Sequence, residues 1–342
     1  MAAWGDSLKM DASSGGGQPA SRRKAEETAL TQPLASVVVC AYTNDRLAQV
    51  RETIASLQKQ TYAAKEIVVI VDHNPGLQQE LGKLAREGIR IAHNTGRQGL
   101  ADARNSGIAL AQGEIIAFID DDAAADEHWL EELVACYRDP DVLASGGAIL
   151  PVWEGGQRPA WLPEEFLWII GCTYRGMQTN GAIRNMIGCN MSFRASVFAE
   201  VGGFDTSVGR LSTQLLGCEE TEICIRALAR WPEKRIVYAP DAVVHHHVAR
   251  FRQTIRYFAR RCYGEGISKV VVRRLWGGAG TSSEMSYLSR ALPRGILRNA
   301  RNVLFFRDVA ASISRIGMIT TGVGAVGAGF AAGMIRQRGY RR

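Results

Sequence analysis

The chain has 342 residues, 46% hydrophobic and 22% charged, which is enough to bury the cores of about two globular domains. Its seven cysteines include no CxxC pair, and the odd number argues against a disulfide framework or a zinc knuckle and indicates reduced thiols in a cytosolic setting. The net charge of +7 comes without a helix-turn-helix, zinc-finger or RNA-binding signature, so we expect no nucleic-acid partner.

Buried strands alternate with helices over the first 120 residues. Residues 1–33 contain no apolar signal core and read as a flexible polar tail. The Val-rich run at 35–42 then predicts a buried strand, with Asn44 and Asp45 available to cap the next helix. Further apolar runs predict three more strands, at 66–72, 88–92 and 114–119. Apolar strands separated by helices indicate an α/β fold with a Rossmann-like, mostly parallel sheet covered on both faces.

Polar residues follow these strands at what should be one edge of the sheet. Tyr42 and Thr43 follow the first strand, Asp72 ends the second, and residues 120–122 are three consecutive aspartates after the fourth. Ligands bind beyond the carboxyl ends of the strands in such sheets. An acidic cap for the helix near Glu127 would explain one carboxylate, but not three strand ends that converge, so a ligand site is favoured.

The chain after residue 140 is less regular. Residues 140–190 are rich in Pro, Gly and Trp, and loops this long are often functional. A helix is expected over 195–201, with a turn at the Gly202–Gly203 pair. Residues 217–231 predict a clear helix with carboxylates in its first turn, where the helix dipole favours them. Residues 235–248 read as a strand, a Pro-Asp turn and a second strand.

Five segments of the chain form a recognisable series: VVVCAYTNDR, VVIVDHN, GLADARNSGIALAQGEIIAFIDDDA, GCNMSFRASVFAEVGGFD and GCEETEICIRA. In this order they resemble the family-2 glycosyltransferases with the GT-A fold. The resemblance extends over about residues 34–250. It implies an inverting enzyme that uses a nucleotide-diphospho-sugar donor.

The aspartate triplet matches the family's metal-binding DxD motif. The leaving group of such a donor is a diphosphate, whose charge a hard cation such as Mg²⁺ or Mn²⁺ takes up as the glycosidic bond breaks. The resemblance implies that Asp120 lies near the ribose and that Asp122 ligates the metal. Asp121 occupies the variable middle position beside the nucleotide. A helix cap alone is the alternative.

The resemblance also implies a set of donor nucleotide contacts. Ala41, Tyr42 and Thr43 match the position that flanks the base, although a bare strand-end turn is an alternative. Asp72 matches a base contact, but VDHN replaces the more usual VDDGS and leaves the identity of the base open. Arg104 either supports the diphosphate or pairs with the aspartates.

Inversion requires a carboxylate that deprotonates the acceptor hydroxyl. The family's base is the Asp of a Gly-Glu-Asp motif before a helix, whereas this chain has Gly217, Cys218, Glu219 and Glu220. Matching the following helix assigns the base to Glu220, with Glu219 and Glu222 as rivals. The alternative is that these residues are only helix N-terminal charges.

Two further residues are candidates for the site. Alternate residues of a strand share a face, so within the HHH run at 245–247, His245 and His247 lie opposite His246. We assign His245 as a possible metal ligand. Asn190, in GCNMSFR, is the candidate contact in the acceptor or donor-sugar pocket.

The C-terminal part differs in charge from the rest. Residues 250–342 carry 18 Lys and Arg against three acidic residues, a net charge of +15, whereas residues 1–249 carry a net charge of −8. Arg252, Arg256 and Arg260 recur every four residues beside an apolar stripe, as in a helix that lies on a membrane, and a similar helix follows Pro293. Residues 316–335 contain no charge, but six glycines make them only mildly hydrophobic.

We therefore predict three parts: a tail over 1–33, a GT-A catalytic domain over 34–250, and a helical membrane-associated region over 251–342. The last part either spans an anionic membrane, lies on it, or packs on the catalytic domain. The predicted function is transfer of a sugar to a lipid-linked or cell-envelope glycan at the cytoplasmic face of the cell membrane. A non-catalytic scaffold that binds nucleotide-sugar or glycan is the rival, and a sugar nucleotidyltransferase is disfavoured because CAYTNDR lacks a triphosphate loop.

Overall fold

A computed structural model describes residues 32–206, 217–277 and 282–339. Pro33–Arg342 form one compact unit. Residues 1–31, nearly all of the predicted tail, lie outside the described part of the chain.

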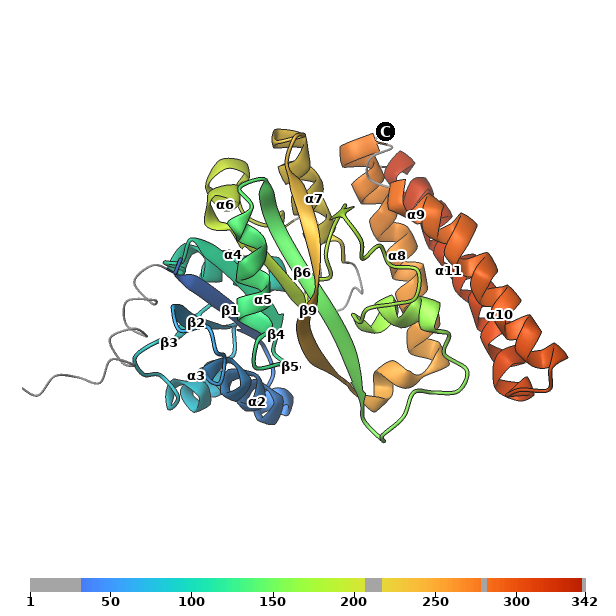
Figure 1. Cartoon of the computed structure of the whole chain (residues 1–342), viewed down its shortest axis with the longest axis horizontal. Coiled ribbons are helices and arrows are strands. Elements are labelled where there is room, and N and C mark those ends of the chain that lie inside the picture. Colours follow the sequence, from blue (N-terminus) through green and yellow to red (C-terminus); the bar gives the residue numbers. More distant parts are fainter. Residues whose placement is uncertain (1–31, 207–216, 278–281, 340–342) are drawn as a thin grey trace, which may run out of the picture. The chain divides into compact units, whose positions relative to one another are not determined.

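A sheet of nine strands runs through the described residues, in the order β3-β2-β1-β4-β8-β6-β9-β5, with β7 paired to β9 (Figure 1). The strands β3, β2, β1 and β4 are parallel, whereas β8 is antiparallel to both β4 and β6. The predicted α/β sheet is confirmed, and it is mixed beyond β4. The strands are β1 (Ala35–Ala41), β2 (Lys65–Val71), β3 (Ile89–His93), β4 (Ile115–Asp120), β5 (Ala123–Ala125), β6 (Val142–Trp153), β7 (Ala182–Ile183), β8 (Asn190–Arg194) and β9 (Arg235–Val248).

Helices cover both faces of this sheet. The apolar runs form strands because side chains on both faces are buried: Val37 and Val39 pack toward α2, α3 and α5, and Val38 packs toward α4, α6 and α7. The helices are α2 (Leu47–Gln58), α3 (Pro75–Gly82), α4 (Leu100–Leu110), α5 (Trp129–Ala135), α6 (Ala195–Val201), α7 (Glu219–Arg230), α8 (Ile255–Trp276), α9 (Ser282–Ser286), α10 (Leu292–Leu304) and α11 (Val309–Gly339), with short turns η1 (Asn44–Arg46), η2 (Cys136–Arg138), η3 (Glu164–Ile170), η4 (Arg250–Gln253) and η6 (Tyr287–Ala291).

Three local predictions differ from the structure. Thr43, rather than Asn44 or Asp45, caps the first turn, because its Oγ1 accepts a hydrogen bond from the backbone N–H of Asp45. The stretch expected to be irregular contains the long strand β6, whose glycines disguise the strand pattern. Residues 235–248 form one strand without a turn, and the pairing of β6 with β9 shifts in register around Pro240.

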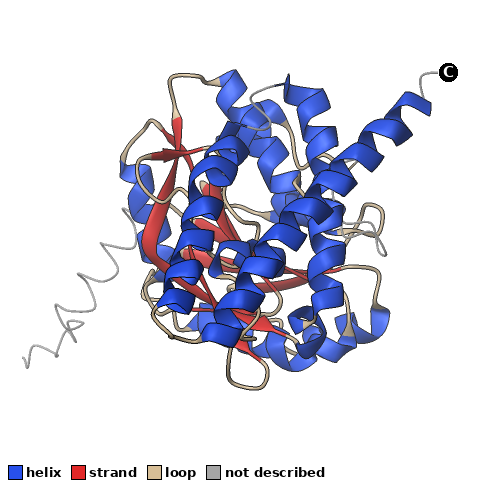
Figure 2. Cartoon of the chain, turned by 90° about the vertical axis from the view of Figure 1, so that its right-hand side faces the viewer, coloured by secondary structure: helices blue, strands red, loops and turns tan. Residues whose placement is uncertain are grey.

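The C-terminal helices pack against one another and against the sheet domain. Figure 2 shows them crossing in front of the strands. Phe258 and Cys262 of α8 are fully buried in the main core. A side chain at Gly266 would strike the backbone of α11 at Val326, and one at Gly329 would strike the backbone of Tyr263, so α8 and α11 approach closely through these two glycines.

α11 is long and apolar enough to cross a membrane by length and composition alone, and only 28% of its most apolar window is buried. Arg252, which the sequence places on an exposed basic stripe, is instead buried, while Arg256 and Arg260 are exposed. The stripe expected at the start of α8 is therefore broken at its first residue.

Candidate active site

The carboxyl ends of β1, β2 and β4 meet at one edge of the sheet, as the sequence predicts. Asp72 lies just after β2 and is 7% exposed. Its carboxylate accepts hydrogen bonds from Asn94 Nδ2 at 2.7 Å and from the backbone N–H of Gly99 at 2.9 Å. These bonds fix the loop that leads into α4, so Asp72 holds the strand edge and presents little of its surface to solvent.

The end of β1 places the predicted base-flanking residues together. The carbonyl of Ala41 accepts a hydrogen bond from the backbone N–H of Asp72, which ties the two strand ends to each other. The ring of Tyr42 is 53% exposed, and the guanidinium of Arg46 lies 5.3 Å from its centroid. An exposed aromatic ring at this edge is available to stack on a flat ligand.

The three aspartates have different surroundings. The Asp120 carboxylate is one-third exposed and lies 3.6 Å from an Arg104 nitrogen. Asp121 is buried and paired with Arg46 at 2.6 Å. Burial raises the pKa of Asp121 to about 7, although Arg46 opposes that shift. Asp120 is therefore the member of the triplet that faces solvent.

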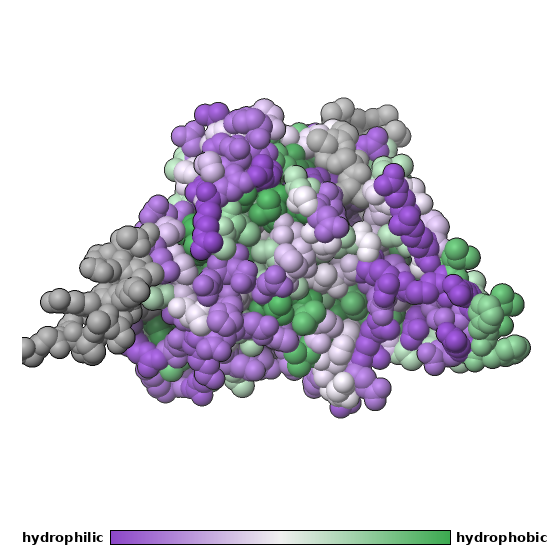
Figure 3. All heavy atoms as spheres, viewed as in Figure 1, coloured by the Kyte–Doolittle hydropathy of each residue, from purple (hydrophilic) through white to green (hydrophobic). Residues whose placement is uncertain are grey.

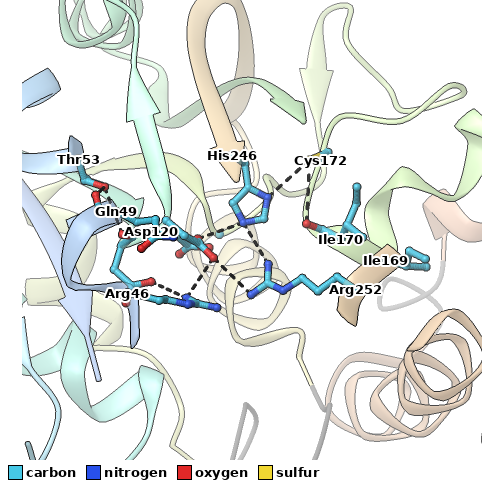
Figure 4. A network of polar contacts seen from close by, with 12 residues as sticks. Arg46, Gln49, Thr53, Asp120, Ile169, Ile170, Cys172, His246 and Arg252 are labelled. Atoms are coloured by element: carbon cyan, nitrogen blue, oxygen red, sulfur yellow. Dashed lines mark hydrogen bonds and ion pairs between the residues drawn. The ribbon is translucent and has the colours of Figure 1, made fainter. Parts of the chain in front are cut away.

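Asp122 is enclosed by the side chains of Arg46, His246 and Arg252, which Figure 4 shows pointing toward one another beside the aspartates. Its oxygens lie 3.1 Å from Arg46, 3.1 Å from His246 Nε2 and 3.4 Å from Arg252. Burial opposes ionisation of Asp122, but His246, Arg252 and Arg46 together hold its pKa below the ordinary value. Asp122 is thus an anion at neutral pH with several competing partners.

The structure brings His246, rather than His245, to the aspartates. His245 Nε2 lies 2.8 Å from Asp126 Oδ1, and 40% of the His245 side chain is exposed. His246 is 2% exposed, and its Nδ1 lies 3.6 Å from Cys172 Sγ. The sequence correctly predicts opposite faces for the two residues, but the assignment of His245 is wrong, because His246 is the histidine that contacts Asp122.

The donor set at this edge fits a divalent cation. Ligand atoms of Asp120, Cys189 and His246 lie within 4.8 Å of one another, and Asp122 contacts the same imidazole. Carboxylate oxygens suit Mg²⁺ and Mn²⁺. Burial raises the pKa of Cys189 well above its ordinary value, so the thiol is protonated and is the weakest donor of the group.

The first turn of α7 carries the predicted base candidates in three environments. Glu219 is buried and accepts a hydrogen bond from Arg104 at 3.1 Å. Glu222 is held by Arg226 at 2.6 Å, one helical turn away. Burial, reinforced by the negative charge of Glu219, raises the pKa of Glu220 to about 7. That value is suited to a general base near neutral pH.

Arg104 connects the aspartate edge with α7. Its guanidinium contacts Asp120 and Glu219 and donates to the carbonyl of Gly188 at 3.2 Å. Of the two roles expected for Arg104, pairing with an aspartate is present in the structure. The side chain is only 3% exposed, so the two carboxylates are held in a fixed relation by one buried cation.

A cavity of about 560 Å³ lies beside these groups. Part of its lining consists of the charged side chains described above, and part consists of apolar residues of α11 and of the segment before α10. A band of charged residues, made of Arg184, Lys269, Glu265 and Glu284, lines it as well. Its lining residues include Arg104, Asp120, Glu219, Glu220, Tyr287, Leu288, Leu292, Val323, Val326 and Phe330.

Asn190 does not line this cavity, which corrects the sequence-based assignment. Its side chain is fully buried, and its amide donates to the carbonyls of Ala148 and Ala242 at 3.0 and 2.8 Å. Its Oδ1 accepts a hydrogen bond from Trp129 at 2.9 Å. With these groups paired, Asn190 fastens β8 to β6 and β9.

Arg46, His246 and Arg252 surround Asp122, although the sequence pattern did not indicate them as site residues. Arg46 follows the first strand closely, and its position after the polar YTND run was the available signal. Arg252 comes from η4, more than a hundred residues after the aspartates, and no local pattern connects it to them.

Comparison with known proteins shows the family of the chain. Residues 36–202 match the family described as Glycosyl transferase family 2. A relative from Haloferax volcanii, the glucosyl-dolichyl phosphate glucuronosyltransferase, is 32% identical over 306 residues, which are 88% of this chain and 96% of the relative. The chain belongs to glycosyltransferase family 2.

Other similar proteins share the family name or the fold. The pre-mycofactocin glycosyltransferase of Mycobacterium tuberculosis is 27% identical over 189 residues, 54% of this chain and 37% of that protein. The solved mannosyltransferase PcManGT from Pyrobaculum calidifontis, in complex with GDP-Man and Mn²⁺, aligns with a TM-score of 0.57 at 17% identity, covering 89% of this chain and 88% of that one. The expected GT-A fold is confirmed, and this family-2 glycosyltransferase is an enzyme.

Proposed function

We propose that this glycosyltransferase moves a sugar, with inversion, from a nucleotide-diphosphate donor to a lipid-linked glycan at the cytoplasmic face of the membrane. One observation carries the proposal. Glu220, a carboxylate with a pKa of about 7, lines the same cavity as Asp120 and Arg104, and that cavity continues along the apolar side chains of α11. The proposed base, the proposed site of the leaving diphosphate and the apolar side chains of α11 therefore all line one cavity.

The donor end is built by the sheet edge. Tyr42 is exposed for stacking on a base, and Asp72 stands beside it at the end of β2. The solved mannosyltransferase, which shares the fold, binds GDP-Man and Mn²⁺. In this chain Asp120, Asp122 and His246 would hold Mg²⁺ or Mn²⁺, which when bound supplies positive charge to the departing diphosphate.

The base acts on the acceptor side. Glu220, once ionised, accepts the proton of the acceptor hydroxyl as that oxygen attacks the anomeric carbon opposite the diphosphate. Arg104 pairs with Glu219 and so leaves the Glu220 carboxylate without that cation as a direct partner. Glu222 is engaged by Arg226 and is not available for this step.

The acceptor class follows from the lining of the cavity and from the relatives. The Haloferax relative is a glucosyl-dolichyl phosphate glucuronosyltransferase, an enzyme named for a dolichyl phosphate-linked substrate. Here the cavity is lined by the carboxylates Asp120 and Glu220, by the charged band that includes Lys269 and Arg184, and by apolar residues of α11. Such a lining suits an amphiphile that has a sugar, a phosphate and a hydrocarbon chain.

The test uses the purified full-length protein. It is incubated with a panel of UDP- and GDP-linked sugars and a polyprenyl phosphate-linked glycan, with MnCl₂ or with EDTA. We expect one donor to support transfer, loss of transfer in EDTA, and a product whose anomeric configuration by NMR is opposite to that of the donor. Donor binding without nucleotide release would support the scaffold reading instead, and a retained configuration would refute the inverting mechanism.

A further inference from the structure

The turn between α10 and α11 exposes a group of large apolar side chains. Leu304 is 72% exposed, Phe305 58% and Phe306 89%. Leu297 on α10 and Ile313 on α11 flank them at 70% and 56%. Figure 3 shows hydrophobic surface at this end of the hairpin, which lies at the right-hand edge of the view. Such a cluster is costly to leave in water and marks an interaction site.

Arginines surround this apolar tip. On the exposed side of α10, Arg294, Leu297, Arg301 and Leu304 follow one another at helical spacing, so cations and leucines share one face. The guanidinium of Arg301 lies 5.6 Å from the Phe305 ring centroid, and Arg307 follows directly after the two phenylalanines. Apolar side chains ringed by arginines are complementary to the boundary between lipid tails and anionic headgroups.

α11 is long and apolar enough for a membrane span, but the helix it packs against is charged. α11 packs along α8 through Gly266 and Gly329. α8 carries charges along its length, from Arg256 to Arg273 and Arg274. A charged side chain at the centre of a bilayer is strongly disfavoured, so a pair of helices that includes α8 does not belong inside the hydrocarbon. The exposed tip, by contrast, extends away from α8.

We propose that the α10–α11 turn, residues 304–306, is the element that inserts into an anionic membrane, while α11 stays packed on α8 outside the hydrocarbon core. The inference deepens the membrane location and rests on that part of the proposed function, but not on the identity of the donor or acceptor. The tip then holds the enzyme at the lipid surface from which the acceptor comes.

The experiment measures binding of the full-length protein to vesicles of phosphatidylcholine alone or mixed with phosphatidylglycerol. We expect binding to the mixed vesicles, and Phe306→Glu should lower the partition coefficient at least tenfold. Ile255→Glu is the matched control, because Ile255 is also apolar and 54% exposed but lies at the start of α8, away from the turn. It should bind like the wild type.

A second readout reports depth. Phe306→Cys labelled with the fluorophore NBD, with labelled wild-type protein as background, should show a blue shift on mixed vesicles. Unchanged binding of Phe306→Glu, or no shift of the probe, would overturn the proposal, as would a Phe306-dependent dimer in sedimentation without lipid. Transfer to a water-soluble acceptor analogue is assayed in parallel: its absence in wild type would count against the proposed function, and vesicle binding would still decide the insertion.

Discussion

Glu220→Gln tests the assignment of the general base. The substitution keeps the size of the side chain and removes its ability to take a proton, so donor binding should be close to that of the wild type. Transfer should fall by about 10²- to 10⁴-fold, the usual contribution of a general base. The loss should appear in kcat, because the proton moves only as the acceptor attacks.

The pH dependence of kcat/KM provides a quantitative test of the same assignment. Burial and the charge of Glu219 raise the pKa of Glu220 to about 7, and the base must be ionised to act. Only about a tenth of the enzyme is then ionised one pH unit below that value, so kcat/KM should fall about tenfold between its plateau and pH 6. Activity therefore rises with pH through about 7. Glu220→Gln should abolish this limb of the profile.

Glu219→Gln separates the base from its neighbour. Loss of the Glu219 charge removes a cause of the raised pKa, so the acid limb should move to lower pH while transfer is retained. The assay follows nucleotide release and transfer to a soluble acceptor analogue from pH 5 to 9 at saturating Mn²⁺. If Glu219→Gln or Glu222→Gln shows the large loss and Glu220→Gln does not, the reasoning about α7 is refuted.

Two further substitutions probe the metal edge and the helix packing. Asp122→Asn should remove Mn²⁺-dependent donor affinity in calorimetry and lower the free energy of unfolding by about 3–5 kcal/mol, because Arg46 and Arg252 lose a buried counterion; unchanged affinity would leave the triplet as a structural cap. Gly329→Ala should destabilise the protein by about 1–3 kcal/mol in thermal unfolding, because the new methyl would strike Tyr263 of α8. Gly324→Ala is its control, since a methyl there meets nothing within 4 Å, and equal stability of the two variants would contradict the packing.

Local pattern was sufficient to predict the strand edge. The runs before Tyr42, Asp72 and Asp120 are apolar enough to be buried strands, and the polar residue that ends each one follows from the same short window. Glu220 was predicted from the family's helix, and its surroundings in the structure agree with that role, although the role itself stays a prediction. These features depend on neighbours in sequence or on a motif.

The side chains that contact the aspartates come from distant parts of the chain, so no short stretch of sequence around the aspartates could predict them. Strand alternation shows that His245 and His246 face opposite ways, but the choice between them is made by β9 pairing with β5, where His246 lies opposite Ala123. Asn190 belongs to a recognisable motif, yet its amide lies where three strands meet and donates hydrogen bonds to backbone carbonyls of β6 and β9. Arg252 resembles a surface cation in sequence and becomes a core ion pair only when η4 meets the sheet.

The cavity takes its walls from several stretches of chain that are far apart in sequence. Arg104 and Asp120 lie at the sheet edge proposed to handle the donor, residues between 166 and 189 and the start of α7 contribute from the middle of the sequence, and α8, α11 and the segment before α10 supply the rest. Under the proposed division of roles, mutations in α8 and α11 should change the choice of acceptor more than the binding of the donor. The C-terminal helices are then the part of the chain in which a new acceptor preference can evolve while the donor groups stay the same.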